Sequence, residues 1–508
     1  MQDIIRAENF SIIPLIVLGA MIAVNFWVVR RDLGVETYEE FATANRSVGF
    51  IGVALAIYTT WYVGAIYTAW AGFAVGLGFI AFYTLVYGTF GLVTMMLIGR
   101  KTFLWGKKYG CQTQADLMGL RYQSKTLKVS LGVAGILFSI PWLFMEFVTL
   151  GIAFEWASYG RVPAWVGILI GVSIVGFYIG LGGMKAAITA SIFQGGFQFI
   201  AGVALMTYLI FKLWGSFGGL FGAIQTQEPA LLTYPGPGAT FPVPFWTSII
   251  ITSSLGNFMW PWVFNKIITA DSIRSIKFAG LGAPILGAIT WTLFVWLGMG
   301  SHLYQEGAAD PQQAYFFIHR LGGPTVLGFF VAVVVATNIS TVAAIIQAIS
   351  THITVDIAEV FDRRISDKGA IRLSRAVVVA SCVVAFGMSV LLSLDKLIFW
   401  ALFTYQGMVL FWPIVVLGMW WKRANAAGAL VGLFGGIGLS WVLTLLKPGF
   451  LGTWGWTEGM YASAFTFIVM LIFGLAKKPE PYVDHLFDDL NPEPYPLVGE
   501  ALPTGATS

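Results

Sequence analysis

The chain has 508 residues, of which 57% are hydrophobic and 11% are charged, whereas about 25% of the residues of an average soluble domain are charged. This composition excludes an ordinary soluble domain. The net charge of +4 says little, because the distribution of charge matters more than its sum, and we expect no nucleic-acid partner. Cys111 and Cys382 lie in unrelated segments and the His residues are scattered. No disulfide framework, metal motif or nucleophile–base spacing is visible, so we expect no enzyme.

Apolar runs near 20 residues long recur along the chain, and this length matches a bilayer core of roughly 30 Å. The first run, residues 10–29, is too long for a signal-peptide core and is followed by Arg30 and Arg31, so we expect it to be retained. Together the runs predict an all-α polytopic membrane protein, surrounded by lipid. We expect its location to be the bacterial inner (plasma) membrane. Its candidate spans, numbered 1 to 13, begin near residues 10, 50, 78, 129, 162, 186, 244, 277, 324, 373, 397, 425 and 458.

Lys and Arg predict the orientation, because they concentrate in cytoplasmic loops. With the N-terminus outside and the C-terminus inside, all but six of the 29 fall on the cytoplasmic side; the six are Arg6, Arg161, Lys212, Arg320, Lys396 and Lys447. The longest outer loop is then about 213–243. The tail 477–508 carries six acids and many prolines, a composition typical of a disordered segment.

Five short stretches carry further information. They are residues 38–49 (YEEFATANRSVG), 113–122 (TQADLMGLRY), 182–194 (GGMK followed by FQ), 336–341 (ATNIST) and 421–428 (WKRANAAG). In this order and on these spans, they resemble the sodium:solute symporter family, which includes proline, pantothenate, monocarboxylate and sugar symporters. The resemblance extends from about residue 38 to 428.

The resemblance implies an inverted repeat of two five-helix units, spans 2–6 and 7–11, as in leucine-transporter-like folds. The topology from Lys and Arg agrees, because span 2 runs outward and span 7 runs inward. The expected divisions are an N-terminal span and cytoplasmic loop (1–49), the first repeat (50–212), the second repeat (244–419), two C-terminal spans (425–476) and the cytoplasmic tail (477–508).

Transporters of this architecture bind their ligands at the midplane, where the first helix of each repeat is broken. Span 2 contains Gly64 and Gly72, and span 7 contains Gly256 and Pro261. Gly weakens a helix interior and Pro removes a backbone hydrogen bond. Although both residues are common in membrane helices generally, their presence in the two corresponding helices favours functional breaks.

The resemblance also implies a Na⁺ site. Na⁺ is a hard cation that prefers oxygen ligands, and the match assigns it the carbonyls of Thr59, Tyr62 and Thr337 with the hydroxyls of Ser340 and Thr341. Residues 337 and 341 lie one turn apart on one helix face, with 340 beside them. The alternative for membrane Ser and Thr is hydrogen bonding to their own helix or filling of close helix contacts.

The solute site is expected between the two broken helices. Alignment places Ser253 and Asn257 of span 7 against it, with Trp61 and Tyr62 as walls, and Gln406 of span 11 is a further polar candidate. Aromatic walls with a few polar groups are typical of small-ligand pockets. Any one ring can equally belong to the core or face lipid.

Glu146 is a further candidate for solute binding, because an acid within a span is costly unless it faces protein or water. It either pairs with a cationic group of the solute, carries a proton or is a hydrogen-bonded structural residue. Ser191 stands where many family members have Asp, and Trp61 stands where proline symporters have Asp.

These features predict Na⁺-coupled symport of a small organic solute by alternating access. The lack of a dense charge cluster and the Trp260-Pro261 element favour a monocarboxylate. Three alternatives stay open: proton-coupled uptake through Glu146, a sensor that keeps the transporter fold without transport, and a channel, although no filter ring is visible.

Overall fold

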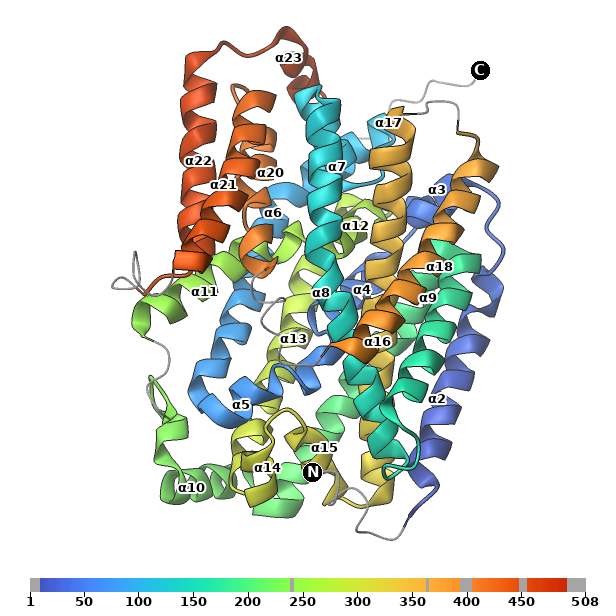
Figure 1. Cartoon of the computed structure of the whole chain (residues 1–508), viewed down its shortest axis with the longest axis vertical. Helices are drawn as coiled ribbons and strands as arrows, with labels where there is room; N and C mark the ends of the chain where they lie inside the picture. Colours follow the sequence, from blue (N-terminus) through green and yellow to red (C-terminus); the bar gives the residue numbers. More distant parts are fainter. Residues whose placement is uncertain (1–9, 238–241, 362–364, 393–403, 447–454, 491–508) are drawn as a thin grey trace, which may run out of the picture.

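The computed structural model describes residues 10–237, 242–361, 365–392, 404–446 and 455–490. Within these ranges the chain is built from helices and their connections, and the β pairing is one isolated bridge between Val48 and Ala270. Nine described helices are long and apolar enough to cross a membrane, and two shorter apolar helices cover residues 50–61 and 404–420. The chain is therefore an all-α, multi-pass membrane protein (Figure 1).

The first predicted repeat begins with a short helix, a break and a second short helix. These are α4 (Phe50–Trp61), η3 (Gly64–Tyr67) and α5 (Ala71–Leu77). Then come α6 (Tyr83–Tyr109), α8 (Lys125–Ala157) and α9 (Ala164–Trp214). The last covers predicted spans 5 and 6 together, which meet at a kink at Gly183 (φ 53°). A Cβ there would lie 2.7 Å from Phe41, so only glycine fits this crossing.

The second predicted repeat begins in the same way, with α11 (Val243–Gly256), η7 (Asn257–Met259) and α12 (Pro261–Ile268). It continues with α13 (Ile273–His302), α16 (Pro324–Thr351), α18 (Asp367–Leu391) and α20 (Phe411–Trp420). The two helices α21 (Ala426–Leu446) and α22 (Glu458–Ala476) pack on each other beside this core (Figure 1).

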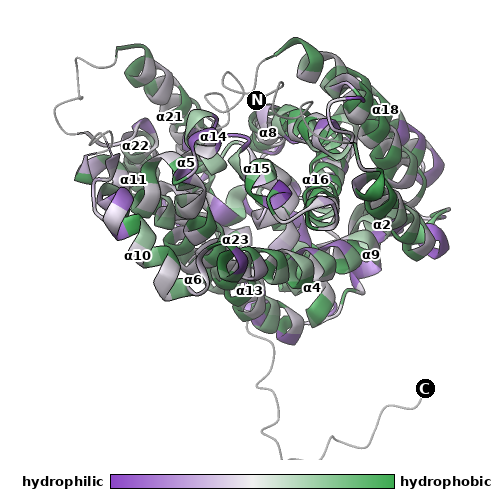
Figure 2. Cartoon of the chain, turned by 90° about the horizontal axis from the view of Figure 1, so that it is seen from below, coloured by the Kyte–Doolittle hydropathy of each residue, from purple (hydrophilic) through white to green (hydrophobic). Residues whose placement is uncertain are grey.

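Helix α16 is the central element of the core. In its most apolar window 94% of the residues are buried, and it packs against α8, α9, α18 and the N-terminal helix α2 (Ile13–Val29). Seen from below, α16 lies among neighbouring helices, with α2 and α18 on the outside (Figure 2). Its polar side chains therefore face protein rather than lipid, which is the setting in which membrane-embedded polar groups are retained.

The connections gather at two opposite ends of the helix bundle (Figure 1). The predicted outer segments α10 (Phe217–Gln227) and α14 (Gln305–Ala309) lie at one end. At the other end lie α3 (Tyr38–Thr43), α17 (Glu359–Phe361) and α23 (Pro481–Asp488), all from predicted cytoplasmic segments. The grouping agrees with the predicted topology, while the side of the membrane that each end faces stays a prediction.

The beginning of the tail differs from its expected disorder. Residues 481–488 form α23, which buries Val483 and Leu486 against the bundle. The indole nitrogen of Trp105 donates to the carbonyl of Leu486 at 2.8 Å, and Lys422 pairs with Asp484 at 2.7 Å. The apolar residues recur at helical spacing, a local pattern that overall composition does not reveal. Residues 491–508 of the predicted tail lie outside the described ranges.

Candidate functional site

The helix of span 2 is interrupted in the middle of the core. Helix α4 ends at Trp61, Tyr62 and Val63 leave the helical conformation, and η3 begins at Gly64. A Cβ on Gly64 would lie 2.3 Å from the side chain of Asn338 on α16, so glycine is required here for close approach of the two elements. Gly72 lies inside α5 with open space around it, and its prediction as a break residue is wrong.

The helix of span 7 is interrupted beside the first break. Gly256 is the last residue of α11, Trp260 is extended (φ −61°, ψ 128°) and Pro261 is the first residue of α12. Pro261 begins a helix rather than disrupting one, because the first turn needs no N–H from it. The rings of Trp61 and Phe258 meet edge to face at 4.9 Å, so the two breaks are in direct contact.

Three of the five predicted Na⁺ ligands meet at one point. The Thr341 hydroxyl donates to the carbonyl of Thr59 on α4 at 3.2 Å and to the carbonyl of Thr337 on its own helix at 3.1 Å. All three residues are fully buried. The second bond is the local one expected of a membrane Thr, whereas the first joins α16 to the end of α4. The alternative of hydrogen bonding also explains both contacts, so the Na⁺ site stays a prediction.

The other two predicted ligands lie nearby but have different partners. The Ser340 hydroxyl is 3.0 Å from that of Ser191, the residue at the position where many family members have Asp. The carbonyl of Tyr62, at the break itself, accepts a hydrogen bond from the side-chain amide of Gln198 at 3.1 Å. Gln198 was not singled out from the sequence, because it lies on α9, far along the chain from the break.

The chemistry of this group of residues suits a singly charged hard cation. Its predicted ligands are neutral carbonyl and hydroxyl oxygens, and the carbonyls of Thr59 and Thr337 both point at one hydroxyl. In the described part of the chain no three or more His, Cys, Asp or Glu residues gather as transition-metal ligands would. Oxygen-only sets are typical of hard cations, so the residues present fit Na⁺.

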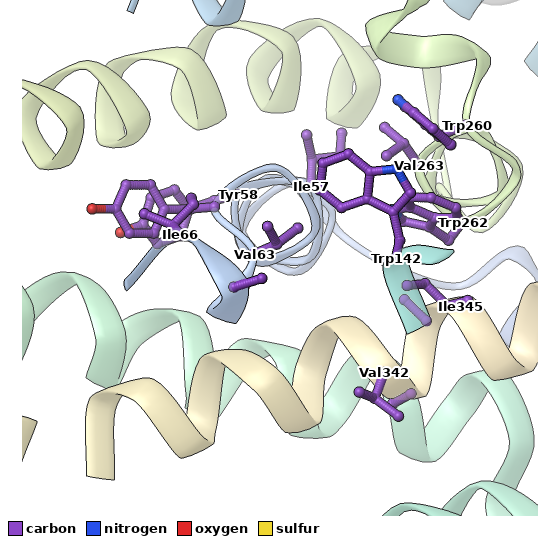
Figure 3. Close-up of a cluster of buried hydrophobic side chains, with 14 of the residues drawn as sticks. Ile57, Tyr58, Val63, Ile66, Trp142, Trp260, Trp262, Val263, Val342 and Ile345 are labelled. Atoms are coloured by element: carbon purple, nitrogen blue, oxygen red, sulfur yellow. The ribbon is translucent and has the colours of Figure 1, made fainter. Parts of the chain in front are cut away.

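A small cavity of about 30 Å³ lies between the two breaks. This volume admits only a few water molecules, so a solute can enter only when the walls move apart. Trp61 and Asn257, two predicted solute-binding residues, line it together with Trp142, Trp260 and Trp262; Figure 3 shows the last three gathered on one side of the break at Val63. The cavity is therefore walled mainly by indole rings.

Ser253 and Gln406 line a second cavity of about 10 Å³. It shares Trp70, Tyr87 and Tyr405 with the first, so the two cavities adjoin. Four of the six predicted solute-binding residues are thus brought to one region, whereas Tyr62 lines another small cavity next to Trp61. The sequence did not single out Trp70 and Trp142, and the only signal for them was the high tryptophan content.

Glu146, the remaining candidate, lies next to the break but does not line either cavity. It is fully buried on α8, and its Oε1 accepts a hydrogen bond from the backbone N–H of Ala65 at 3.0 Å. Its Oε2 has no hydrogen-bond partner among the described residues. Because Val63 and Ile66 line the cavity, the carboxyl group lies directly behind the cavity wall.

Known proteins resemble this chain over most of its length. The family model for the sodium:solute symporter family matches residues 41–436. The sodium/pantothenate symporter of Escherichia coli (strain K12) is 23% identical over 478 residues, covering 91% of this chain and 96% of that protein. The uncharacterized symporter YhjB of Bacillus subtilis (strain 168) is 24% identical over 283 residues, 55% of this chain and 58% of that protein's length.

The fold also matches a solved structure. A Na⁺-coupled sialic acid symporter in its substrate-bound outward-open state superposes with a TM-score of 0.76 at 15% identity, covering 92% of this chain and 97% of that one. At this identity the likeness establishes the fold alone. The two broken helices and the central α16 therefore belong to an architecture that is known among transporters.

Proposed function

Because this chain belongs to the sodium:solute symporter family, a family of multi-pass membrane transporters, we propose that it couples Na⁺ entry to the uptake of a small organic solute. The observation that carries this proposal is the Thr341 hydroxyl, which joins the carbonyls of Thr59 and Thr337 between α4 and α16. The solute is a small molecule, and the protein resides in the bacterial plasma membrane.

The broken helix explains how an ion and a solute become coupled. The interruption after Trp61 leaves backbone carbonyls without helical partners; side chains of Thr341 and Gln198 bond to two of them, and buried groups of this kind need a partner. A Na⁺ ion held by Thr59, Tyr62, Thr337, Ser340 and Thr341 supplies one and ties the end of α4 to α16. The other side of the same break lines the aromatic cavity, so the ion fixes a cavity wall before the helices move to open the opposite face.

The neutral oxygen ligands of the proposed site also predict how many Na⁺ ions accompany each solute molecule. Ser191, in the place of the usual Asp, touches Ser340 and adds a neutral hydroxyl to the neighbourhood of the proposed ion. A site without a carboxylate ligand binds a hard cation weakly, because affinity rises with ligand charge. We therefore expect modest Na⁺ affinity and one Na⁺ per solute.

Two expectations from the sequence, the alternative of proton coupling and the favoured monocarboxylate, gain no support from the geometry. Glu146 holds the N–H of Ala65 at the break, a contact that a structural role explains without proton coupling. The expected monocarboxylate is not matched by a cationic side chain, because the described residues lining the cavity include no Lys or Arg.

Transport in proteoliposomes tests the proposal. With K⁺ as the replacement cation, a Na⁺ gradient should drive accumulation of a solute from a labelled panel, and a pH gradient alone should not. In detergent, NaCl should raise the melting temperature above the value in KCl of equal ionic strength, since an ion that binds only the folded state stabilises it. Uptake driven by a pH gradient without Na⁺, or a charge ratio showing two Na⁺ per solute, contradicts the proposal.

A further inference from the structure

Six tryptophans and two tyrosines surround the cavity between the two helix breaks. Trp142 is at the centre of this aromatic cage: its ring lies 5.2 Å from that of Trp70 and 5.5 Å from that of Trp260. Trp260 in turn lies 4.7 Å from Trp262 and 5.3 Å from Tyr405. These rings come from four separate parts of the chain, since Trp260 and Trp262 lie together at the start of α12, and each of the five is at least 92% buried. The fold has therefore assembled the cage from distant parts of the chain.

Such a cage offers negative ring faces rather than apolar surface alone. The face of an indole ring attracts a cation within about 6 Å, and several rings around one space recognise methylated ammonium groups. No described side chain lining the cavity carries a positive charge that would compete for these faces. The cage therefore favours a cationic group whose charge is spread over methyl groups.

Glu146 places a carboxyl group behind the wall. It lies one turn after Trp142 on α8, on the same helix face. Its carboxyl group reaches the backbone at Ala65, between the two cavity-lining residues Val63 and Ile66. Its Oε2 has no hydrogen-bond partner among the described groups, and a buried unpaired acidic oxygen is costly. A cation held in the cage would supply the nearby partner that the Glu146 carboxyl group lacks.

The same walls also contain unused hydrogen-bond donors. The indole N–H groups of Trp61, Trp142 and Trp262 and the side-chain amide nitrogen of Asn257 are buried without a partner in the described structure. All four residues line the cavity. Buried donors are normally satisfied, so the occupant is expected to bring an acceptor oxygen as well as a cation.

We propose that the solute is a small methylated ammonium compound that also bears an acceptor oxygen, its cation held by the Trp142 and Trp260 faces and its oxygen by the neighbouring N–H donors. This inference rests on the proposed transport function, because it names the solute of that same site. The expected solute is then no longer a plain monocarboxylate but a compound that is recognised mainly through its cationic group.

A matched pair of probes isolates the charge. Glycine betaine and 3,3-dimethylbutanoate have the same shape and the same carboxylate, but only the first has a quaternary nitrogen. Binding of each to the purified full-length protein in NaCl is measured by tryptophan fluorescence and calorimetry. We expect glycine betaine to bind about tenfold or more tightly than its carbon analogue, the difference that a desolvated cation–π contact supplies.

Variants then locate the contact. Trp142→Phe and Trp260→Phe keep an aromatic ring but weaken its cation–π attraction, so each should weaken betaine binding several-fold and leave the analogue unaffected. Trp296→Phe is the matched control, because Trp296 packs on Phe217 and Phe221 away from the cage. Na⁺-specific thermal stabilisation, measured on every variant, reports that the fold and the ion site are intact.

The outcomes separate the two proposals. Equal or tighter binding of 3,3-dimethylbutanoate overturns the ammonium inference in favour of a monocarboxylate. Binding of neither probe while Na⁺ still stabilises the protein also overturns it and leaves sodium coupling standing. Absence of any Na⁺-specific stabilisation counts against the proposed function itself, whichever probe binds.

Discussion

At the scale of single residues, Thr341 has two roles that the sequence could not separate. Its hydroxyl bonds to the carbonyl of Thr337, as membrane threonines commonly do, and also reaches the carbonyl of Thr59 across a helix interface. A hydroxyl that only satisfied its own helix would have no reason to lie at a helix break. Its position is therefore the feature on which the proposed ion site rests.

Replacing Ser340 and Thr341 together by Ala should abolish Na⁺-stimulated uptake. Two of the five proposed ligands are then lost, and the melting temperature should become the same in NaCl as in KCl. Insertion and folding should survive, since the removed groups are small. The matched control is Ser440→Ala with Thr444→Ala, a Ser/Thr pair on α21 whose Thr444 hydroxyl bonds within its own helix at 2.8 Å. Unchanged Na⁺ dependence in the first double variant contradicts the site.

Glu146 distinguishes sodium from proton coupling. Glu146→Gln keeps an oxygen that accepts from the N–H of Ala65, so under Na⁺ coupling it should retain a substantial part of gradient-driven uptake. Glu146→Leu removes that acceptor and should lose most of it, because it leaves a buried N–H unpaired at a cost of about 1–3 kcal/mol. Loss of driven uptake in Glu146→Gln with intact solute exchange and a flattened pH profile would instead establish proton coupling.

At the scale of elements, the two broken helices depend on close packing rather than on helix-breaking residues alone. Gly64 is the contact point, since its missing side chain leaves the space that the Asn338 side chain occupies. Asn338 is held in place by its own bond to the Val334 carbonyl at 2.9 Å. The break in span 2 therefore packs closely against the central helix α16 at Gly64.

Gly64→Ala should destabilise the protein by about 1–3 kcal/mol, the usual cost of overpacking a buried contact, and should lower Na⁺-driven uptake. Adding Asn338→Ala should recover part of the lost stability, since the two side chains occupy the same space. Gly72→Ala is the control, because a Cβ there meets no atom within 4 Å. Thermal unfolding of Gly64→Ala, Asn338→Ala, the double variant and Gly72→Ala measures the coupling, and equal losses for Gly64→Ala and Gly72→Ala would refute it.

Gly64 and Gly72 show which features of the fold could be predicted from the sequence and which could not. The order of elements and the two breaks could be predicted from hydrophobic runs and from the family resemblance, because runs and motifs are patterns of residues that are neighbours in the sequence. The reason for Gly64 was not accessible, since it depends on Asn338, which is remote in the chain. The aromatic cage escaped prediction for the same reason: Trp70, Trp142 and Trp260 lie on different elements, and the sequence contains many other rings.

At the scale of the whole molecule, charged side chains form ion pairs at one end of the bundle. Ion pairs such as Lys128–Asp116 at 2.6 Å and Lys185–Glu40 at 2.8 Å lie at the end that carries α3 and α23. At that end the hydrogen bond from Lys185 lowers the pKa of the Glu40 carboxyl below its usual value. The positive-inside rule assigns this end to the cytoplasm, a prediction that chemical labelling can check.

Labelling of introduced cysteines should show α10 outside and the segment after α22 inside. The native Cys111 and Cys382 are buried, so they should add little background with a membrane-impermeant maleimide. Gln227→Cys, at the exposed end of α10, should react in intact cells. Lys478→Cys, exposed just beyond α22, should react only after the membrane is permeabilised. The opposite pattern would place most of the Lys and Arg residues outside, and it would invert the direction in which each broken helix crosses the membrane.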